Sequence, residues 1–390
     1  MPSDNAAQDR PDADSPALGS ARRRAAARGA ERILNRSPLH VPLTERLSAL
    51  AAAALEIVGP DDPTDVYGDG VVATLEEEVA RLLGKEAAAF FPTGTMAQQV
   101  ALRCWAGRTG NATVALHPKA HPELHESGAF SAVSGLRTVH PADGPTLPTA
   151  DEVRDFEEPF GALMLELPLR DAGFVLPTWE ELEAVVAAAR ERDAVVHFDG
   201  ARLWECTQWF DRPLAEIAGL ADSVYVSFYK SLEGLSGAAL AGPATLVEEA
   251  KVWRHRYGGQ LFQQFPTAVS ALLGLRHTLP RLPEYVVHAR VVAEALREGF
   301  GAAGVPWSRV HPERPHTHQF QVWLPYACEV LSEASLGQAE ETGTLLFGRW
   351  FPEGPPGLSV TEVTVTEEGL KWTADDVKEA VAEFVRRLPR

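Results

Sequence analysis

Between about residues 64 and 271, the pattern of hydrophobic and polar positions alternates between short apolar runs and segments with helical spacing. The apolar runs predict strands at residues 87–91, 162–169, 194–199 and 223–228. The segment between the second and third runs opens at Thr178, with Glu181 three residues later, which is the signature of a capped helix. Apolar strands that alternate with helices predict an α/β fold with a mostly parallel central sheet covered on both faces.

Beyond about residue 271 this alternation ends. A helix-prone stretch at residues 285–302 leads to strand candidates at 318–326 and at "GLSVTEVTV", and a final helix follows. We expect a smaller α+β domain here. The opening residues are rich in Ala, Arg, Asp, Pro and Ser, a composition typical of disorder. The expected organisation is therefore a disordered tail (1–30), an N-terminal arm with the large domain (31–273) and a small C-terminal domain (274–390).

Composition narrows the function classes. The net charge of −18 argues against a nucleic-acid partner, and the basic cluster at residues 22–24 is interpreted as part of a solvated tail. No apolar run approaches the ~20 residues of a membrane span. Three cysteines without a CxxC pair favour a reducing, cytoplasmic setting. The histidines of "HPKAHPELH" lack metal-ligand spacing, so no metal site is expected.

Two polar residues follow successive predicted strands. Asp199 closes "AVVHFD" and Lys230 follows "SVYVSF", at the carboxyl ends where open α/β sheets bind ligands. Desolvation beside apolar strand residues should lower the pKa of this lysine, which suits Schiff-base formation. An aspartate nearby can pair with a cationic ring nitrogen, and both residues together suit pyridoxal phosphate chemistry. The two residues taken by themselves fit an ordinary ion pair equally well.

A third candidate is the turn Thr93-Gly94-Thr95, between a predicted strand and a predicted helix. Free N–H groups at a helix N-terminus, flanked by hydroxyls, can bind a phosphate, although the same turn is also a good N-cap. His121, in "HPELHE", can stack on a planar ring or be an ordinary loop residue. A phosphate site, a ring-nitrogen partner and an imine lysine, in this order, favour pyridoxal phosphate over the separate ordinary interpretations.

These stretches resemble the threonine aldolase and β-eliminating lyase family of fold-type-I pyridoxal-phosphate-dependent enzymes. The resemblance runs from "DVYGDG" through "FFPTGTMAQQVAL", "HPELHESGAF" and "HFDGARLWE" to "RHRYGGQLFQQ", and it is loose in the C-terminal domain. It implies an aspartate aminotransferase-like large domain, pyridoxal 5'-phosphate as cofactor and a small amino-acid substrate. It also implies a homodimer or homotetramer, without a membrane or nucleic-acid partner.

The resemblance implies a role for each matching residue. Lys230 would form the imine with the cofactor, Asp199 would pair with the pyridine nitrogen and His121 would stack on the ring. Arg202 would help bind the substrate carboxylate. The remaining matches lie near the cofactor: Thr93, Gly94 and Thr95 would hold its phosphate, and Tyr257, Gly258 and Gly259 would lie beside it, at or across a subunit boundary.

The sequence also departs from the family. The family's Glu-Asn-Thr-His run, whose histidine is a candidate base for the substrate hydroxyl, is Glu166-Leu167-Pro168-Leu169 here. The late strand "GLSVTEVTV" has no arginine, although aldolases anchor the substrate carboxylate from about that position. Arg36 and Arg170 are arginines that the family pattern lacks. We therefore expect a moved carboxylate anchor, with Arg202 as its main residue and Arg170 or Arg36 as a second contact.

The leading hypothesis is a lyase that cleaves a β-hydroxy amino acid to glycine and an aldehyde. β-Elimination, racemisation or transamination of another amino acid keeps the same cofactor and changes the bond that breaks. A third hypothesis is a non-catalytic relative that binds the cofactor or keeps only the fold.

Overall fold

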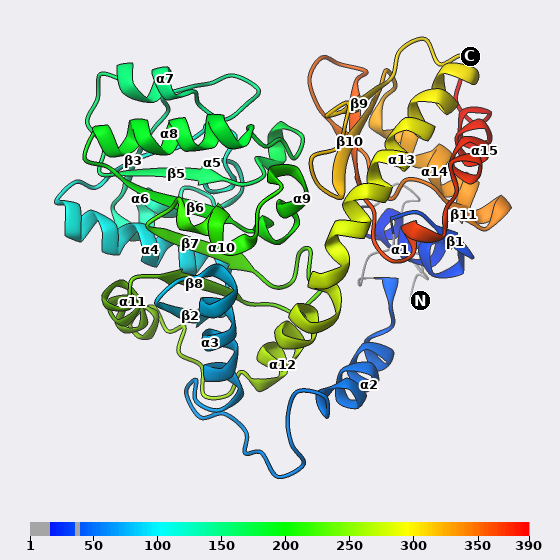
Figure 1. The fold of residues 1–390 in the computed structure, drawn as a ribbon. Coiled ribbons are helices and arrows are strands. Elements are labelled where there is room, and N and C mark those ends of the chain that lie inside the picture. Colours follow the sequence, from blue (N-terminus) through cyan, green and yellow to red (C-terminus); the bar gives the residue numbers. More distant parts are fainter. Residues whose placement is uncertain (1–15, 36–39, 390) are drawn as a thin grey trace, which may run out of the picture. The chain divides into compact units, whose positions relative to one another are not determined.

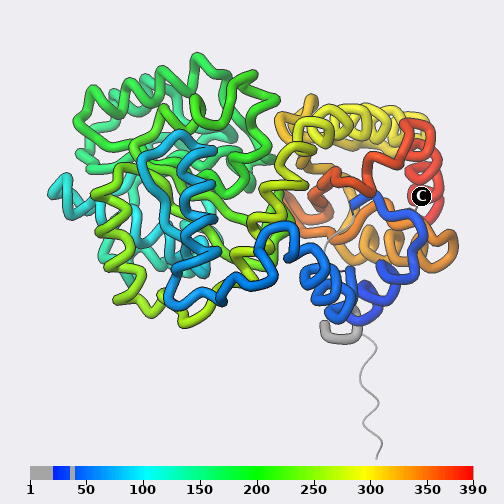
Figure 2. Tube along the Cα trace, turned by 60° about the horizontal axis from the view of Figure 1, so that its bottom comes forward, coloured from blue at the N-terminus to red at the C-terminus, as the bar shows by residue number. Residues whose placement is uncertain are grey.

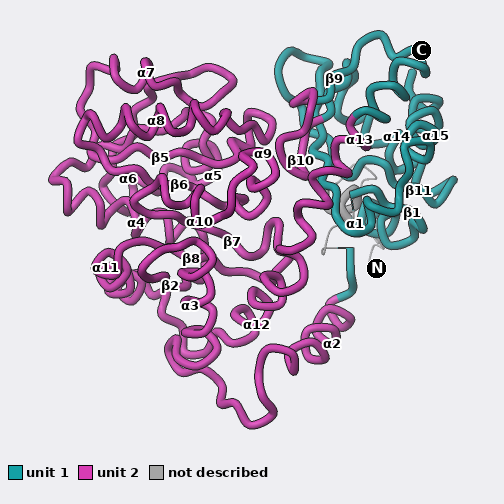
Figure 3. The backbone as a smooth tube through the Cα atoms, in the orientation of Figure 1, with its two compact units in different colours: residues 1–42, 294–310, 322–390 teal, residues 43–293, 311–321 magenta. Residues whose placement is uncertain are grey.

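The computed structural model describes residues 16–35 and 40–389, and the chain divides into two compact units (Figure 3). Unit 2 is the larger and contains residues 43–293 and 311–321. Unit 1 contains residues 1–42, 294–310 and 322–390. Each unit is therefore assembled from segments that are far apart in the sequence.

Unit 2 is built on a seven-stranded mixed sheet (Figure 1). Five neighbouring strands are parallel to one another, and β8 is antiparallel to both of its neighbours. In sheet order the strands are β2 (Ala87–Phe91), β8 (Ala238–Gly242), β7 (Ser223–Ser227), β6 (Val195–Gly200), β5 (Ala162–Glu166), β3 (Thr113–Ala115) and β4 (Arg137–Val139). Every residue of β5, β7 and β8 is buried, as a parallel-type sheet covered on both faces requires.

Helices connect and cover these strands. Thr178 caps the start of α8, and its side chain accepts from the Glu181 amide in the predicted capping box. The α-helices of unit 2 are α2 (Leu43–Ala54), α3 (Val71–Leu83), α4 (Gly94–Thr109), α5 (His121–His125), α6 (Ala129–Ser134), α7 (Ala150–Asp155), α8 (Trp179–Glu191), α9 (Thr207–Phe210), α10 (Leu214–Gly219), α11 (Ala244–Arg256), α12 (Phe265–Leu273) and the first part of α13 (Leu282–Ala302). α4 and α11 share one apolar core with β2, β7 and β8. This packing fixes the start of α4 against the sheet.

Unit 1 contains most of a four-stranded sheet and a short parallel pair. The four-stranded sheet has the order β12 (Phe351–Pro352), β13 (Ser359–Thr364), β10 (Gln319–Leu324) and β9 (Arg309–His311). The parallel pair joins β1 (Arg32–Ile33) to β11 (Thr344–Leu345). Its helices are α1 (Pro16–Gly29), α14 (Cys328–Thr342), α15 (Ala374–Val385) and the later part of α13 (Leu282–Ala302), which Figure 2 traces in yellow. This α+β arrangement confirms the expected class of the C-terminal part.

The N-terminal segment corrects the expected disordered tail over residues 16–29, which form α1. Ala26 and Ala27 are buried in a cluster with Leu336 of α14, and Arg22 pairs with carboxylates of the same helix. The alanines favour a helix, and burial on α14 supplies the apolar contact that composition did not reveal. The rest of the expected tail, residues 1–15, lies outside the described residues.

The unit boundary also differs from the expected division at residues 273 and 274. It falls within α13, after Ala293, and residues 311–321 belong to unit 2. Residues before 43 belong to unit 1, because β1 pairs with β11. Over the described residues, every helix is too short or too polar to cross a membrane.

Candidate active site

The carboxyl ends of three adjacent strands bring three buried polar side chains together. Register pairs Glu166 at the end of β5 with Asp199 on β6, and Asp199 with Tyr225 on β7. All three residues are at most 4% exposed. Residues paired on neighbouring strands point to the same face of a sheet, so these side chains lie side by side. We call Glu166, Asp199 and Tyr225 the strand-end row.

The strand-end row holds two carboxyl groups away from water. Burial and the neighbouring Asp199 raise the pKa of Glu166 to about 7, although the amides of His121 and Arg170 oppose this rise. Burial likewise raises the pKa of Asp199, against the attraction of Lys230. Two carboxyls that face each other in a dry site cannot both ionise easily, and a nearby cation relieves this cost.

Lys230 follows β7 and lies within electrostatic reach of both carboxyls. Burial and Arg202 lower the pKa of its ammonium to about 8, although Asp199 and Glu166 favour the charged form. The predicted desolvation of this lysine is therefore confirmed. A pKa near 8 leaves a useful fraction of neutral amine close to neutral pH, which a nucleophilic lysine needs.

Asp199 is fixed through one of its two oxygens. Its Oδ1 accepts from the Ala201 amide at 3.1 Å, the one hydrogen bond that the described residues give this carboxylate. The bond orients the carboxyl group and leaves Oδ2 available. A buried carboxylate oxygen of this kind fits a cationic N–H donor.

The turn Thr93-Gly94-Thr95 forms the start of α4, close to the strand-end row. The Thr93 side chain accepts from the Met96 amide at 3.2 Å, so the predicted N-cap exists. The amides of Gly94 and Thr95 belong to the first turn, which has no intrahelical acceptors to offer them. A Cβ at Gly94 would overlap the phenol oxygen of Tyr225. Glycine thus allows Tyr225 to pack against the turn, which brings an anion-binding helix end beside the row.

His121 is tied to the strand-end row through its backbone. Its amide donates to Glu166 Oε2 at 2.7 Å, and its ring Nδ1 lies 3.4 Å from Glu126 Oε1. The Glu126 side chain is 3% exposed, and its second oxygen is buried without a hydrogen-bond partner in the described part of the chain. The ring of His121 is about one-third exposed, so it combines an accessible face with a buried carboxylate behind it.

Two of the three candidate arginines belong to this neighbourhood, and they differ in their partners. The guanidinium of Arg202 lies over the Phe174 ring at 5.3 Å, and its Nε is buried without a hydrogen bond among the described residues. Arg170 donates its amide to Glu166 Oε1 at 3.2 Å and lies 3.6 Å from Asp171. Arg36 lies outside the described residues.

The segment Tyr257-Gly258-Gly259 ends α11 and returns to the start of α4. Gly258 has a φ of 75°, and a Cβ at Gly259 would overlap the sulfur of Met96. Gly258 therefore suits a left-handed backbone conformation, and Gly259 allows a close backbone approach to the first turn of α4. The phenol oxygen of Tyr257 is buried without a hydrogen bond among the residues described.

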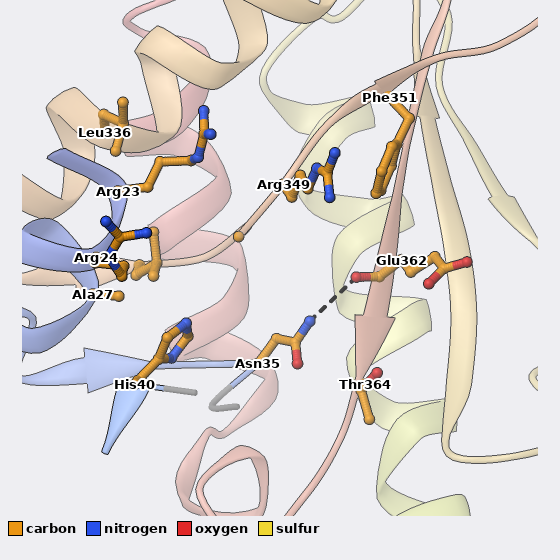
Figure 4. Close-up of a pocket in the computed structure, with 12 residues that line it drawn as sticks. Arg23, Arg24, Ala27, Asn35, His40, Leu336, Arg349, Phe351, Glu362 and Thr364 are labelled. Atoms are coloured by element: carbon orange, nitrogen blue, oxygen red, sulfur yellow. Dashed lines mark hydrogen bonds between the residues drawn. The ribbon is translucent and has the colours of Figure 1, made fainter. Parts of the chain in front are cut away.

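Unit 1 has a separate cavity of about 780 Å³ (Figure 4). Arg23 and Arg24 of α1 and Arg349 line it, together with the apolar Leu336 and Phe351. The Asn35 amide donates to the Glu362 carbonyl at 3.2 Å across one end. Of the site residues predicted from the sequence, those that the structure describes do not line this cavity.

Two members of the strand-end row were not predicted as site residues. Glu166 was noted only as part of a departure from the family, and Tyr225 only as a strand residue. The available signal for Glu166 was a carboxylate directly after the apolar run "ALML", at the same kind of strand end as Asp199. Tyr225 gave no signal, because its role depends on the contact with Gly94.

The strand order and this site define a fold-type-I enzyme fold of the pyridoxal-phosphate-dependent class. A serine palmitoyltransferase of Sphingomonas wittichii shares this fold, with a TM-score of 0.61 at 15% identity over 87% of this chain and 82% of its own. The chain belongs to the beta-eliminating lyase family, whose model matches residues 44–310.

Individual relatives are named as aldolases. The chain is 28% identical to low-specificity L-threonine aldolase 1 of Arabidopsis thaliana, over 72% of this chain and 80% of the relative. It is 34% identical to low specificity L-threonine aldolase of Escherichia coli strain K12, over 60% and 72%. A solved structure of a proposed L-allo-threonine aldolase from Listeria monocytogenes EGD-E has a TM-score of 0.85 at 32% identity, and the match covers 95% of this chain and all of that one.

Proposed function

We propose that this chain is a pyridoxal-phosphate-dependent lyase that cleaves a β-hydroxy amino acid to glycine and an aldehyde. One observation carries the proposal: Lys230 lies beside a row of buried acidic and phenolic groups that packs against the start of α4. The relatives named as threonine aldolases support the choice of reaction.

The residues present fit pyridoxal phosphate. The first-turn amides of α4, with the Thr95 hydroxyl, would hold the phosphate at the positive end of the helix. Asp199 would use its available Oδ2 for the pyridine nitrogen, and His121 would stack on the ring. Lys230 would bond to the aldehyde carbon. An apolar pair in place of Asp199 and Lys230 would fill the same space without the cost of burying charges, so a ligand that uses them explains their presence.

When bound, pyridoxal phosphate supplies an electron sink for negative charge at the α-carbon of an amino acid. Asp199 would keep a proton on the ring nitrogen, because a buried carboxylate favours a cation beside it. Lys230, with its pKa near 8, would present a neutral amine and take up or return a proton at Nζ.

On the substrate side, Arg202 would bind the α-carboxylate through a guanidinium whose Nε has no hydrogen-bond partner in the described part of the chain. His121, with Glu126 3.4 Å behind it, is our candidate to accept the proton of the substrate hydroxyl. It would replace the family histidine, because Leu169 at that position is fully buried and cannot titrate. His125 is less suited, since Asp171 already lies 2.9 Å from its Nε2.

A panel of amino acids tests the proposal. The purified protein with added pyridoxal phosphate should release glycine and an aldehyde from L-threonine, L-allo-threonine or another β-hydroxy amino acid, and Lys230→Ala should abolish the release. Pyruvate, an α-keto acid or a D-amino acid as the main product would instead support elimination, transamination or racemisation. The absence of every product, with no cofactor bound, would support a non-catalytic relative.

We also propose that the chain forms a homodimer or homotetramer, as its family resemblance implies. Light scattering of the purified protein tests this assembly, and a monomer at all concentrations would contradict it.

A further inference from the structure

A second buried constellation lies directly behind Lys230. Glu205 belongs to the turn after β6, His318 comes from the segment 311–321, and Ser231 follows Lys230 in the chain. His318 Nε2 lies 2.7 Å from Glu205 Oε2, and the Ser231 hydroxyl donates to the same oxygen at 2.5 Å. Three distant stretches of unit 2 thus meet at one carboxylate oxygen.

The constellation is deeply buried. The side chains of Glu205 and His318 are at most 1% exposed, and Tyr285 stacks on the His318 ring with centroids 6.1 Å apart. Burial opposes ionisation of Glu205, but His318, Arg202 and Ser231 together lower its pKa. The carboxylate is therefore charged in a dry environment. Such a charge costs several kcal/mol to bury unless its partners compensate.

The segment that carries Glu205 also carries Asp199 and Arg202, and it is bonded to the lysine segment at several points. Ser227, at the end of β7, donates from its hydroxyl to the Ala201 carbonyl at 3.0 Å, and its own carbonyl accepts from Trp204 Nε1 at 2.9 Å. These two bonds hold the chain before Lys230. The Ser231–Glu205 bond holds it directly after Lys230, so the lysine lies between two attachments.

The chain beyond Ser231 turns back sharply. The Gly234 amide donates to the Phe228 carbonyl at 2.8 Å, and Glu233 has a φ of 58°. Within this turn Ser231 and Leu232 are buried, whereas Lys230 is half-buried. The side-chain bond of Ser231 therefore attaches the chain to Glu205 at the residue next to Lys230.

We propose that Glu205, held by His318, is a positioning residue that fixes the backbone at Lys230 through Ser231. It acts on the amine indirectly, since the distance between Lys230 Nζ and Asp199 depends on the segment that Glu205 joins. The inference rests on the proposed function, because it concerns the lysine that would bond to pyridoxal phosphate.

The test compares two buried serines of unit 2. Ser231→Ala removes the bond to Glu205. Ser134→Ala, the matched control, removes a buried bond of equal length, 2.5 Å, between Ser134 and the Gln99 side chain. Each purified apoprotein is mixed with pyridoxal phosphate, and the rate at which borohydride fixes the cofactor on Lys230 is followed by absorbance and peptide mass. The melting temperature of each apoprotein is recorded in parallel.

We expect Ser231→Ala to lower the rate of fixation at Lys230 about tenfold. A tenfold change corresponds to about 1.4 kcal/mol, which is near the lower end of the contribution of a hydrogen bond to a charged group. The melting temperature should fall in both serine variants, but the fixation rate of Ser134→Ala should match wild type, so a loss of stability by itself does not slow fixation. Glu205→Gln, which removes the charge but keeps an acceptor, should also slow fixation at Lys230.

Two outcomes are distinguishable. Equal fixation rates in Ser231→Ala and Ser134→Ala, with wild type fixed at Lys230, would overturn the positioning role and leave the proposed function intact. If borohydride fixes no cofactor on Lys230 of the wild-type protein, the proposed function itself fails. Should Glu205→Gln not fold, the two serine variants still decide the question.

Discussion

Replacement of Glu166 by glutamine should change how the stability of the apoprotein depends on pH. The pKa of Glu166 rises from 4.5 to about 7 in the folded protein, so the native state keeps a proton that the unfolded chain releases. Glu166 therefore contributes its full stabilisation below pH 4.5, and this contribution is lost as the pH rises through about 7. At ~1.4 kcal/mol per pKa unit, the full change is on the order of 3 kcal/mol.

Glutamine removes this titration but adds a constant cost. Its NH₂ group must face one of the two amides, of His121 or Arg170, that now donate to Glu166. That cost is the same at every pH, so the titration is read from the difference between two pH values. The free energy of unfolding of Glu166→Gln minus that of wild type should therefore be about 3 kcal/mol higher at pH 8 than at pH 4.5.

Urea unfolding of the apoproteins from pH 4.5 to 8 measures this difference, with Glu183→Gln on the exposed face of α8 as the control. The control curve should parallel wild type. If the Glu166→Gln and wild-type curves also run parallel across this range, Glu166 does not titrate as the buried strand-end row requires.

Three further experiments test the proposed cofactor and substrate contacts. Asp199→Ala should lower turnover roughly 10- to 100-fold while the protein stays folded, and Asp199→Glu should retain more; full activity of the alanine variant would remove Asp199 from the site. Gly94→Ala should lower the affinity for pyridoxal phosphate about tenfold, because the new Cβ would clash with Tyr225. Adding Tyr225→Phe to this variant should restore part of the affinity. A double variant that binds no better than Gly94→Ala would contradict this contact. Arg202→Lys should lower kcat/KM about tenfold and Arg170→Lys much less, and the reverse order would place the carboxylate on Arg170.

The alternating pattern was sufficient to predict the large sheet and much of the site. β2 covers residues 87–91 as predicted, and α8 starts at the predicted capping box. Strand ends in a parallel sheet share one edge, so placing Asp199 and Lys230 there needed only the positions of two apolar runs. Local signals of this kind survive folding, because each depends on a few consecutive residues.

Other features depend on contacts between distant residues and left no local signal. The side chain of Tyr225 belongs to the site because Gly94, more than a hundred residues earlier, leaves room for it. Glu205 ends the stretch "HFDGARLWE" and His318 begins a predicted strand, but nothing local in the sequence shows that the two side chains meet. α1 packs on α14, which lies in the C-terminal part of the chain, so the order of α1 could not be predicted from its own residues. Composition described residues 16–29 by themselves and missed that partner.

The two described arginines of the predicted anchor have different partners, and this difference bears on which of them would bind the substrate carboxylate. Arg170 lies in a chain of contacts through Asp171 to His125, and its amide also serves Glu166. A substrate carboxylate would have to compete with Asp171 for that guanidinium. Arg202 lies on the Phe174 ring with its Nε buried and without a hydrogen bond among the described residues. The Nε of Arg170 is buried in the same way, but its guanidinium already has the Asp171 carboxylate 3.6 Å away, so an incoming anion gains more at Arg202 than at Arg170. Arg202 also lowers the pKa of Lys230, and an anion bound to Arg202 would weaken that effect. Binding of the substrate carboxylate would therefore raise the basicity of the lysine, which favours a proton on Nζ once the amino acid has entered the site.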